Sequence, residues 1–254
     1  MKIKEIFPNP TVKQVIFQIV FPNLFYIENK IGDLQMKIMK EFPESSLAFR
    51  RQIFFADVGP EVKFESIQSG LEKGVTQKIW QFKSSKNFQL NVLNDSLDIG
   101  SQFHKTYDLG EGEKFRDIIK FVLDCFLEIM HIPIIRRIGL RYIDECPITS
   151  KDNSTFRSYY NTTFPLNRFN LADADEMDFK ATIRKGTYFL RYAESLKKFD
   201  AEYKLILDFD GFAKDIVSEN YLKVTDDLHK IIRKEFEQTI KEPVIKYMRL
   251  KKEN

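Results

Sequence analysis

The stretch that decides the fold is IPIIRRIGLRYIDECPI, at residues 132–148. Its β-branched and apolar residues predict a buried strand. The charged residues in it are Arg136, Arg137, Arg141, Asp144 and Glu145. Because an unpaired charge is costly to bury, these side chains predict partners elsewhere in the fold. A second apolar run, LILDFDGF at residues 205–212, supplies the carboxylates of Asp208 and Asp210.

The composition predicts a folded protein with a sizeable core. The chain has 254 residues, of which 43% are hydrophobic and 30% charged, and 24 are phenylalanine. This balance excludes a disordered chain, and phenylalanine buries a large area. The formal net charge of +3 is too small to indicate nucleic-acid binding by itself.

The cysteines and the N-terminal sequence predict a cytoplasmic protein. Cys125 and Cys146 form neither a disulfide framework nor a metal-binding spacing, so we expect reduced thiols. The N-terminal residues lack the apolar segment of a signal peptide. The longest apolar run, residues 15–27, is interrupted and too short to span a bilayer. We therefore expect a soluble protein with no membrane association.

Hydrophobic periodicity predicts strands next to strands, with few helices between them. The expected strands are residues 11–21, 49–58, 78–82, 87–94, 102–109, 134–146, 179–184, 187–194 and 203–212. The expected helices are residues 31–42, 113–130 and 228–240, the last with Thr225 or Asp226 as its N-cap. Short turns between strands favour antiparallel pairing.

The pattern as a whole predicts the α+β class. We expect one domain over residues 1–254, with a curved, mainly antiparallel sheet that has two long helices and one short helix on one face. Residues 149–178 show no clear period and are predicted to form an irregular loop region. Residues 246–254 are predicted to form a basic C-terminal tail.

Five segments together resemble a known family. They are VIFQIVF, FQLNVLND, RRIGLRYIDECPI, LILDFDGF and the C-terminal LHKIIRKEFEQTIKEPVIKYM. In this order they resemble the sporadically distributed family of uncharacterised bacterial and archaeal proteins of about this length. The family typically shows Arg-Tyr-Ile-Asn where this chain has Arg141-Tyr142-Ile143-Asp144. The resemblance implies a single domain and an accessory prokaryotic role, such as defence or toxin–antitoxin systems, and implies no activity.

Two pairs of side chains on the apolar strands are candidates for a site. Arg141 and Asp208 are expected to pair through two parallel hydrogen bonds, as a structural ion pair or as part of a ligand-binding site. Asp208 and Asp210, two residues apart, share one face of a strand. With Glu202 and Lys204 they are weak candidates for a metal-dependent nuclease. The alternative is that Asp210-Gly211 forms a turn at the end of the strand.

Basic and aromatic residues give a nucleic-acid-binding alternative. The candidates for phosphate contacts are Arg136, Arg137, Lys246, Arg249 and Lys251. Trp80, Phe82 and Phe88 are candidates for stacking on bases. The competing interpretation places these aromatic residues in the core and the charges on a solvated surface.

No motif of a cofactor site or of a common enzyme class is found. His104, His131 and His229 lie far apart, and a zinc site needs at least three protein ligands. Glycine-rich phosphate loops and the GxSxG motif of many hydrolases are absent. We therefore predict no cofactor and no metal, and a non-enzymatic binding module with a protein partner or a second copy as homodimer. Nucleic-acid binding and a metal-dependent nuclease are the alternatives.

Overall fold

The computed structural model describes residues 5–52, 75–199 and 202–250. The strands are β1 (Val12–Val20), β2 (Glu44–Gln52), β3 (Val75–Lys83), β4 (Phe88–Val92), β5 (Ser96–Ser101), β6 (Ile134–Cys146), β7 (Met177–Lys185), β8 (Tyr188–Phe199) and β9 (Glu202–Val217). The helices are α1 (Ile27–Ile38), α3 (Phe115–Met130), α4 (Asn153–Tyr159), α5 (Tyr221–Thr239) and α6 (Glu242–Arg249).

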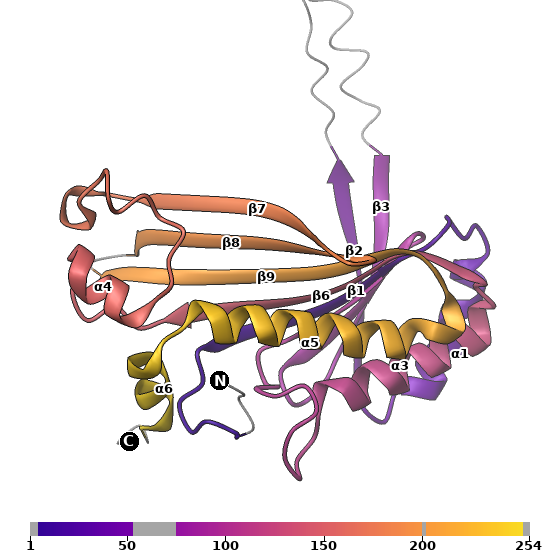
Figure 1. Ribbon diagram of the computed structural model, residues 1–254. Coiled ribbons are helices and arrows are strands. Elements are labelled where there is room, and N and C mark those ends of the chain that lie inside the picture. Colours follow the sequence, from indigo (N-terminus) through magenta and orange to yellow (C-terminus); the bar gives the residue numbers. More distant parts are fainter. Residues whose placement is uncertain (1–4, 53–74, 200–201, 251–254) are drawn as a thin grey trace, which may run out of the picture.

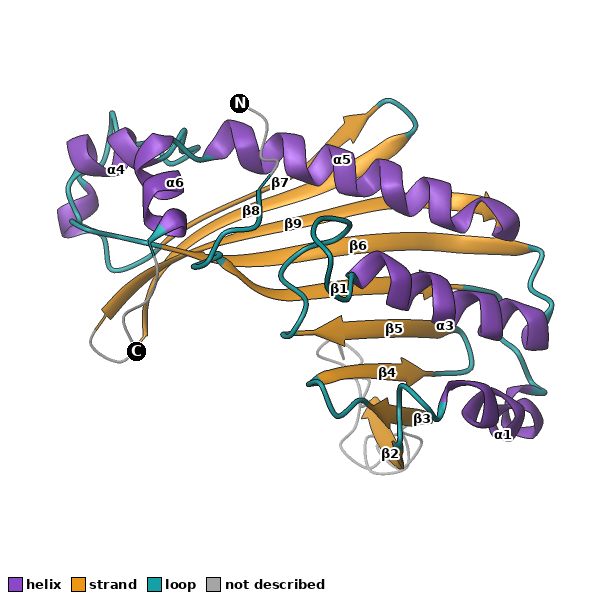
Figure 2. Cartoon of the chain, turned by 90° about the horizontal axis from the view of Figure 1, so that it is seen from below, coloured by secondary structure: helices purple, strands orange, loops and turns teal. Residues whose placement is uncertain are grey.

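The nine strands form one antiparallel sheet, which confirms the predicted α+β class. Their order is β2-β3-β4-β5-β1-β6-β9-β8-β7, so β1 and β6 join two antiparallel halves. Figure 1 shows the sheet nearly edge-on, with α1, α3 and α5 on one side of it. These are the short helix and the two long helices that the periodicity predicts. Two further helices, α4 and α6, lie together at one end of the sheet (Figure 2).

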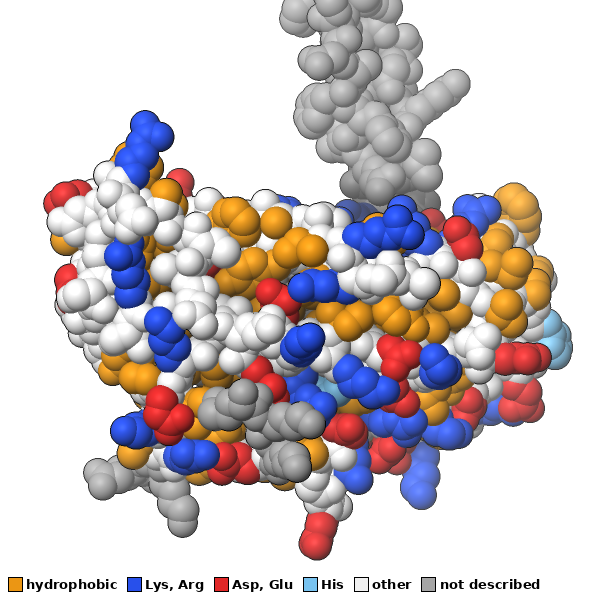
Figure 3. All heavy atoms as spheres, in the orientation of Figure 1, with side chains coloured by type: hydrophobic (Ala, Val, Ile, Leu, Met, Phe, Trp, Pro, Cys, Tyr) orange, Lys and Arg blue, Asp and Glu red, His pale blue; other side chains and the backbone are white. Residues whose placement is uncertain are grey.

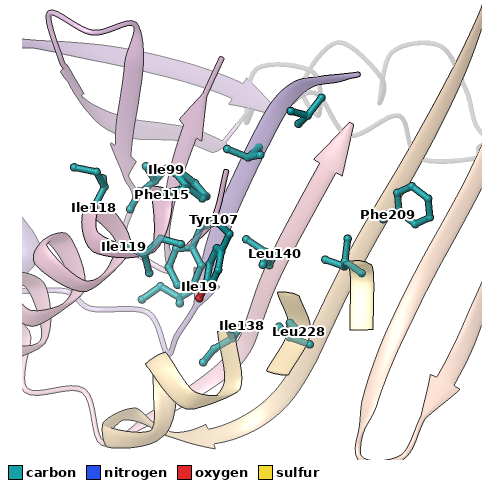
Figure 4. Packing of buried hydrophobic residues seen from close by; sticks show 14 of the residues in the cluster. Ile19, Ile99, Tyr107, Phe115, Ile118, Ile119, Ile138, Leu140, Phe209 and Leu228 are labelled. Atoms are coloured by element: carbon teal, nitrogen blue, oxygen red, sulfur yellow. The ribbon is translucent and has the colours of Figure 1, made fainter. Parts of the chain in front are cut away.

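Alternation along the strands separates the core from the opposite face of the sheet. In β1, Val15, Phe17 and Ile19 are buried under the helices, while the residues between them are half-exposed. The long apolar stripe of α3 contributes Phe115, Ile119 and others to the same layer (Figure 4). The many phenylalanines therefore serve the core that the composition predicts.

The central pair of strands sets the register of the whole sheet. β6 and β9 pair antiparallel along nearly their entire length, with Leu140 opposite Gly211 and Arg141 opposite Asp210. β1 pairs with the other edge of β6, so Arg141 lies between Ile16 and Asp210. Leu140 and Phe209 point into the core beside α5 (Figure 4).

Several predicted boundaries differ from the structure, including that of the first helix, which spans Ile27–Ile38 rather than residues 31–42. Residues 102–109 form a loop, and the strand is β5, whose core face carries only Leu97, Ile99 and Ser101. Helix α5 begins at Tyr221, because Tyr221 and Val224 extend its buried stripe, so Thr225 lies inside the helix and Asn220 is its N-cap. Part of the predicted strand 49–58 lies outside the described residues.

Two regions predicted to be irregular contain helices. Within residues 149–178, Asp152 accepts a hydrogen bond from the Thr155 backbone N–H and caps α4, which buries Phe156. The predicted tail instead begins inside α6, whose Val244, Ile245 and Met248 are buried. Pro243 stands in the first turn of α6, where the missing backbone N–H of proline costs no helical hydrogen bond.

Within the described ranges, none of the helices combines the length and the apolar character needed to cross a bilayer.

The core makes a direct stability prediction. Phe17 is fully buried in β1, so Phe17→Ala is expected to lower the free energy of unfolding by about 3–5 kcal/mol. Phe49 on the edge strand β2 is 61% exposed, and Phe49→Ala is expected to change it by less than about 0.5 kcal/mol. Urea unfolding measures both, and equal losses would contradict this assignment of the core.

Candidate functional site

The face of the sheet opposite α1, α3 and α5 carries the predicted site residues. We call it the open face and define it by Gln18 of β1, Arg137 and Arg141 of β6, Asp208 and Asp210 of β9 and Arg191 of β8. Alternation places all of them on one side, and hydrogen bonds link most of them. Within the described part of the chain, no helix packs over this face (Figure 1).

Arg141 and Asp208 form the ion pair that the sequence predicts. Nε and Nη2 of Arg141 donate to the two carboxylate oxygens of Asp208, at 2.8 and 2.5 Å. The pair runs diagonally across β6 and β9, since Asp208 lies opposite Ile143 in the register. The hydrogen bonds to Asp208 raise the pKa of the Arg141 guanidinium. Arg141 therefore engages both carboxylate oxygens of Asp208.

A second, more buried ion pair lies beside the first. Nη2 of Arg137 donates to both oxygens of Asp210, at 2.9 and 3.0 Å, and Nη1 donates to Gln18 at 3.0 Å. Arg191 approaches the same carboxylate from β8, at 3.4 Å. Asp210 therefore holds two guanidinium groups from opposite sides, and strands β1, β6, β9 and β8 are linked by side chains as well as by backbone.

Gly139 leaves the space that the Arg137 side chain occupies. A Cβ atom at this position would lie only 2.4 Å from Nη1 of Arg137. The guanidinium thus crosses the bare backbone of β6 to reach Asp210. A glycine inside a strand is often a sign of such close approach.

Two aromatic rings of the open face pack against the guanidinium groups of Arg137 and Arg191. Phe189 and Phe212 stack with their centroids 5.1 Å apart and their planes within 13°. Arg137 and Arg191 lie over the Phe212 ring, at 4.9 and 5.9 Å from its centroid. A planar guanidinium on an aromatic face gains cation–π attraction and loses side-chain freedom. These arginines are therefore held in fixed positions.

The other half of the open face is lined by amide side chains. A hollow of about 400 Å³ lies there, bordered by Gln14, Gln89, Asn91, Asp98 and Gln102. Asn91 accepts from the side-chain amides of Gln81 and Gln89 and donates to Asp98 at 2.8 Å. Burial raises the pKa of Asp98, against the effect of the Asn91 bond. The open face thus presents ordered hydrogen-bonding groups on both halves.

The nuclease residues do not form a metal site. Lys204 contacts Glu145 at 3.5 Å, Glu202 is exposed at the start of β9, and both aspartates are held by arginines. No group of three or more His, Cys, Asp or Glu residues suited to a metal occurs in the described residues. Asp210-Gly211 does not form a turn either, because β9 continues to Val217.

The basic residues predicted to contact phosphates are not brought together. Arg137 is committed to Asp210, and Arg136 is exposed near the start of β6, whereas α6 lies beyond the opposite end of that strand (Figure 2). Arg249 pairs with Glu5, Lys246 is exposed on α6, and Lys251 lies outside the described residues. Figure 3 shows cations and carboxylates intermixed over α5 and α3 on the visible side.

The predicted stacking residues belong to the core. Phe82 and Phe88 are 2% and 3% exposed, and Trp80 packs against the core from β3. All three point to the helix side of the sheet, where an alternating pattern of this kind buries aromatic residues. Phe82 and Phe88 are therefore too buried to stack on bases, while Trp80 is partly buried.

Asp144, where the resembled family has an asparagine, lies on the core side of β6. It is 5% exposed and accepts a 2.7 Å hydrogen bond from the Thr11 hydroxyl. Burial raises the pKa of Asp144 to about 7, against the Thr11 bond. The carboxyl is therefore largely neutral below pH 7. A neutral carboxyl, like the amide of an asparagine, can both donate and accept hydrogen bonds.

Sequence reasoning missed three parts of this arrangement. No local sequence pattern identifies Arg191 and the Phe189–Phe212 pair as site residues, because their roles depend on β8 lying beside β9. The close approach over Gly139 was detectable, since glycine interrupts an otherwise β-branched run. His229, set aside on spacing alone, packs against Tyr107 and Tyr142 on the core side.

No protein-family model matches the chain, and a search of curated proteins finds no significant match. The resemblance to the sporadically distributed family therefore stays a prediction, and the site is interpreted from its own geometry.

The two ion pairs are expected to differ in their contribution to stability. The Asp210 side chain is 11% exposed and that of Asp208 is 23% exposed, while their arginines, Arg137 and Arg141, are 25% and 43% exposed. Arg137→Gln is expected to cost about 2–3 kcal/mol, because a largely buried carboxylate loses its main partner. Arg141→Gln is expected to cost about 1 kcal/mol. Urea unfolding at pH 7 tests the ranking, and the reverse order would contradict it.

Asp144 predicts a pH-dependent stability. The unfolded chain releases this proton near pH 4, whereas the folded protein holds it until about pH 7. Stability from this group is therefore full below pH 4 and lost as the pH rises to about 7. Asp144→Asn removes this loss, so the variant is expected to be more stable by about 2 kcal/mol or more at pH 8, and by less at pH 5. A difference that is constant from pH 5 to pH 8 would contradict the assignment.

Proposed function

We propose that the protein is a non-enzymatic binding module that holds a protein partner on its open face. The observation that carries the proposal is the combination of an uncovered sheet face with an ordered array of guanidinium, amide and carboxylate groups. Arginine is enriched at protein interfaces, where a polar, hydrogen-bonded surface is common. Groups fixed before binding lose less entropy on association.

The state of the carboxylates on the described part of the open face supports binding over catalysis. The open-face carboxylates that sequence analysis considered for metal chemistry are each held by an arginine at 3.0 Å or less. A general acid or base needs a group that exchanges its proton near the working pH. Asp208 and Asp210 each bind a guanidinium through both oxygens, so their geometry suits the positioning of an arginine better than proton transfer.

A protein partner fits this face better than a polyanion does. Arg137 and Arg141 already satisfy carboxylates of the chain itself, so they are not free to neutralise phosphates. The amide hollow offers donors and acceptors of the kind that pair with a polypeptide backbone or with polar side chains. The accessory prokaryotic role and the cytoplasmic location implied by the sequence belong to this same proposal.

Lysines on the open face and on the helices allow the position of the interface to be tested within one protein. Native mass spectrometry of the protein purified from its own host gives the stoichiometry of a partner or of a homodimer. Acetylation of the isolated protein and of the complex is then compared residue by residue. Lys180, Lys197 and Lys214 of the open-face strands are expected to be protected, while Lys30, Lys120 and Lys223 on the helices react equally in both.

A charge-reversal pair sharpens the test. Lys180→Glu with Lys214→Glu is expected to weaken capture of the partner at least tenfold, and Lys223→Glu on α5 serves as the matched control. Protection confined to the helical lysines, or equal loss in the control, would contradict the placement of the interface.

Nucleic acid is the second candidate, favoured by the exposed cations Lys180, Arg184 and Lys214 near one edge of the open face. Binding of a labelled single-stranded oligonucleotide that weakens steeply with salt would support it. Binding that is absent at low salt would exclude it.

A further inference from the structure

A separate cavity lies on the helix side of the sheet, away from the open face. Its volume is about 130 Å³, close to that of an apolar cavity that holds benzene. The walls come from the N-terminal segment, the loop at residues 105–109, β6, β9, α5 and α6. Two of its lining residues, Tyr107 and Phe209, are among the buried residues labelled in Figure 4.

The cavity contains a buried carboxyl group with unused bonding capacity. Oδ1 of Asp144 accepts from Thr11, and no partner among the described residues is found for Oδ2. Oδ2 is also not among the fully enclosed polar atoms that lack a partner. Because Asp144 lines the cavity, its second oxygen is available to a ligand. A ligand that donates to this oxygen would add a charge-assisted hydrogen bond to the one from Thr11.

Aromatic rings surround the carboxyl. The cavity is lined by Phe7, Tyr107, Tyr142, Phe209, Phe236 and His229. Such walls suit a flat body, and aromatic faces attract a cation. A carboxylate inside an aromatic enclosure is therefore complementary to a planar cationic group.

His229 forms part of the cavity wall as a neutral imidazole. Tyr107 stacks on His229 with centroids 4.3 Å apart, and the hydroxyl of Tyr142 lies 3.3 Å from its Nδ1. The Tyr107 hydroxyl donates to Asp226, which Arg116 holds through two bonds. Burial lowers the pKa of His229 to about 4. A neutral ring does not repel a bound cation, and it is a weak base at neutral pH, which favours binding over proton transfer.

We propose that this cavity binds a small, flat organic cation, an amidinium or guanidinium on an apolar body, whose N–H groups donate to Asp144. The cation donates to the carboxylate oxygen that faces the cavity, and its body fills the space between the aromatic rings. This site is independent of the open face and of the partner proposed for it.

Side chains of both charge signs surround the cavity. The charged or titratable groups that border it are Glu5, Lys105, Tyr107, Asp108, Tyr142, His229 and Arg233. Cys146 of β6 and Asp208 of β9 lie near Asp144. Asp108 is 3.8 Å from Nε2 of His229, so it adds a carboxylate at the rim. Asp144 is thus the buried anion, and the exposed charges act as a screened background.

Benzamidine is the probe, with benzamide and toluene as neutral controls. Isothermal titration of the full chain is expected to show one site for benzamidine and at least tenfold weaker binding of both controls. Because Asp144 must ionise to hold the cation, affinity is expected to rise up to about tenfold per pH unit from pH 5 and to level off above about pH 7. Binding of toluene as tight as that of benzamidine would overturn the proposal, as would no binding of benzamidine.

Asp144→Asn preserves the shape of the site and removes the anion. It is expected to weaken benzamidine binding at least tenfold at pH 8 and to abolish the pH dependence, while its thermal unfolding shows that it is folded. Asp33→Asn on the exposed side of α1 makes the same charge change on a helix that does not line the cavity. This variant is expected to bind benzamidine like the natural protein. Unchanged affinity in Asp144→Asn would overturn the proposal.

Discussion

The pairing of β6 with β9 is the constraint on which the rest of the structure depends. Both strands are long and lie near the middle of the sheet, and where they pair, apolar core residues alternate with residues of the open face. Their register places Leu140 and Phe209 in the core and Arg141 and Asp210 on the open face. A shift by one residue would exchange the two faces and bury every one of these charges.

The diagonal ion pairs reinforce that register in a way that backbone hydrogen bonds do not. Arg141 reaches Asp208, and Arg137 reaches Asp210 across Gly139, so each arginine contacts a carboxylate displaced from its direct neighbour. A different register would leave these carboxylates without partners. The same contacts arrange the guanidinium groups on the open face, so the features that specify the fold also form the surface proposed to bind.

Much of the architecture was predictable because it depends on local alternation and helical periodicity. The strand at residues 134–146, the long helix α3 and the Arg141–Asp208 pair were all predicted from short segments. β5 was missed because its charged, glycine-containing sequence resembles a loop, and it is a strand only because β1 and β4 flank it. The cavity was beyond prediction, since it joins the N-terminal segment, β6 and α5 through tertiary packing.

The strand order leaves two edges, β2 and β7, with backbone groups that no described strand pairs. An exposed edge invites pairing with other chains, and lysine or arginine on it is a common natural protection. β7 carries Lys180, Arg184 and Lys185 within nine residues. Like charges would oppose pairing with a second copy of β7 in registers that set Lys180 opposite Arg184. The long sheet therefore ends, at β7, in a strand that resists uncontrolled extension into larger aggregates.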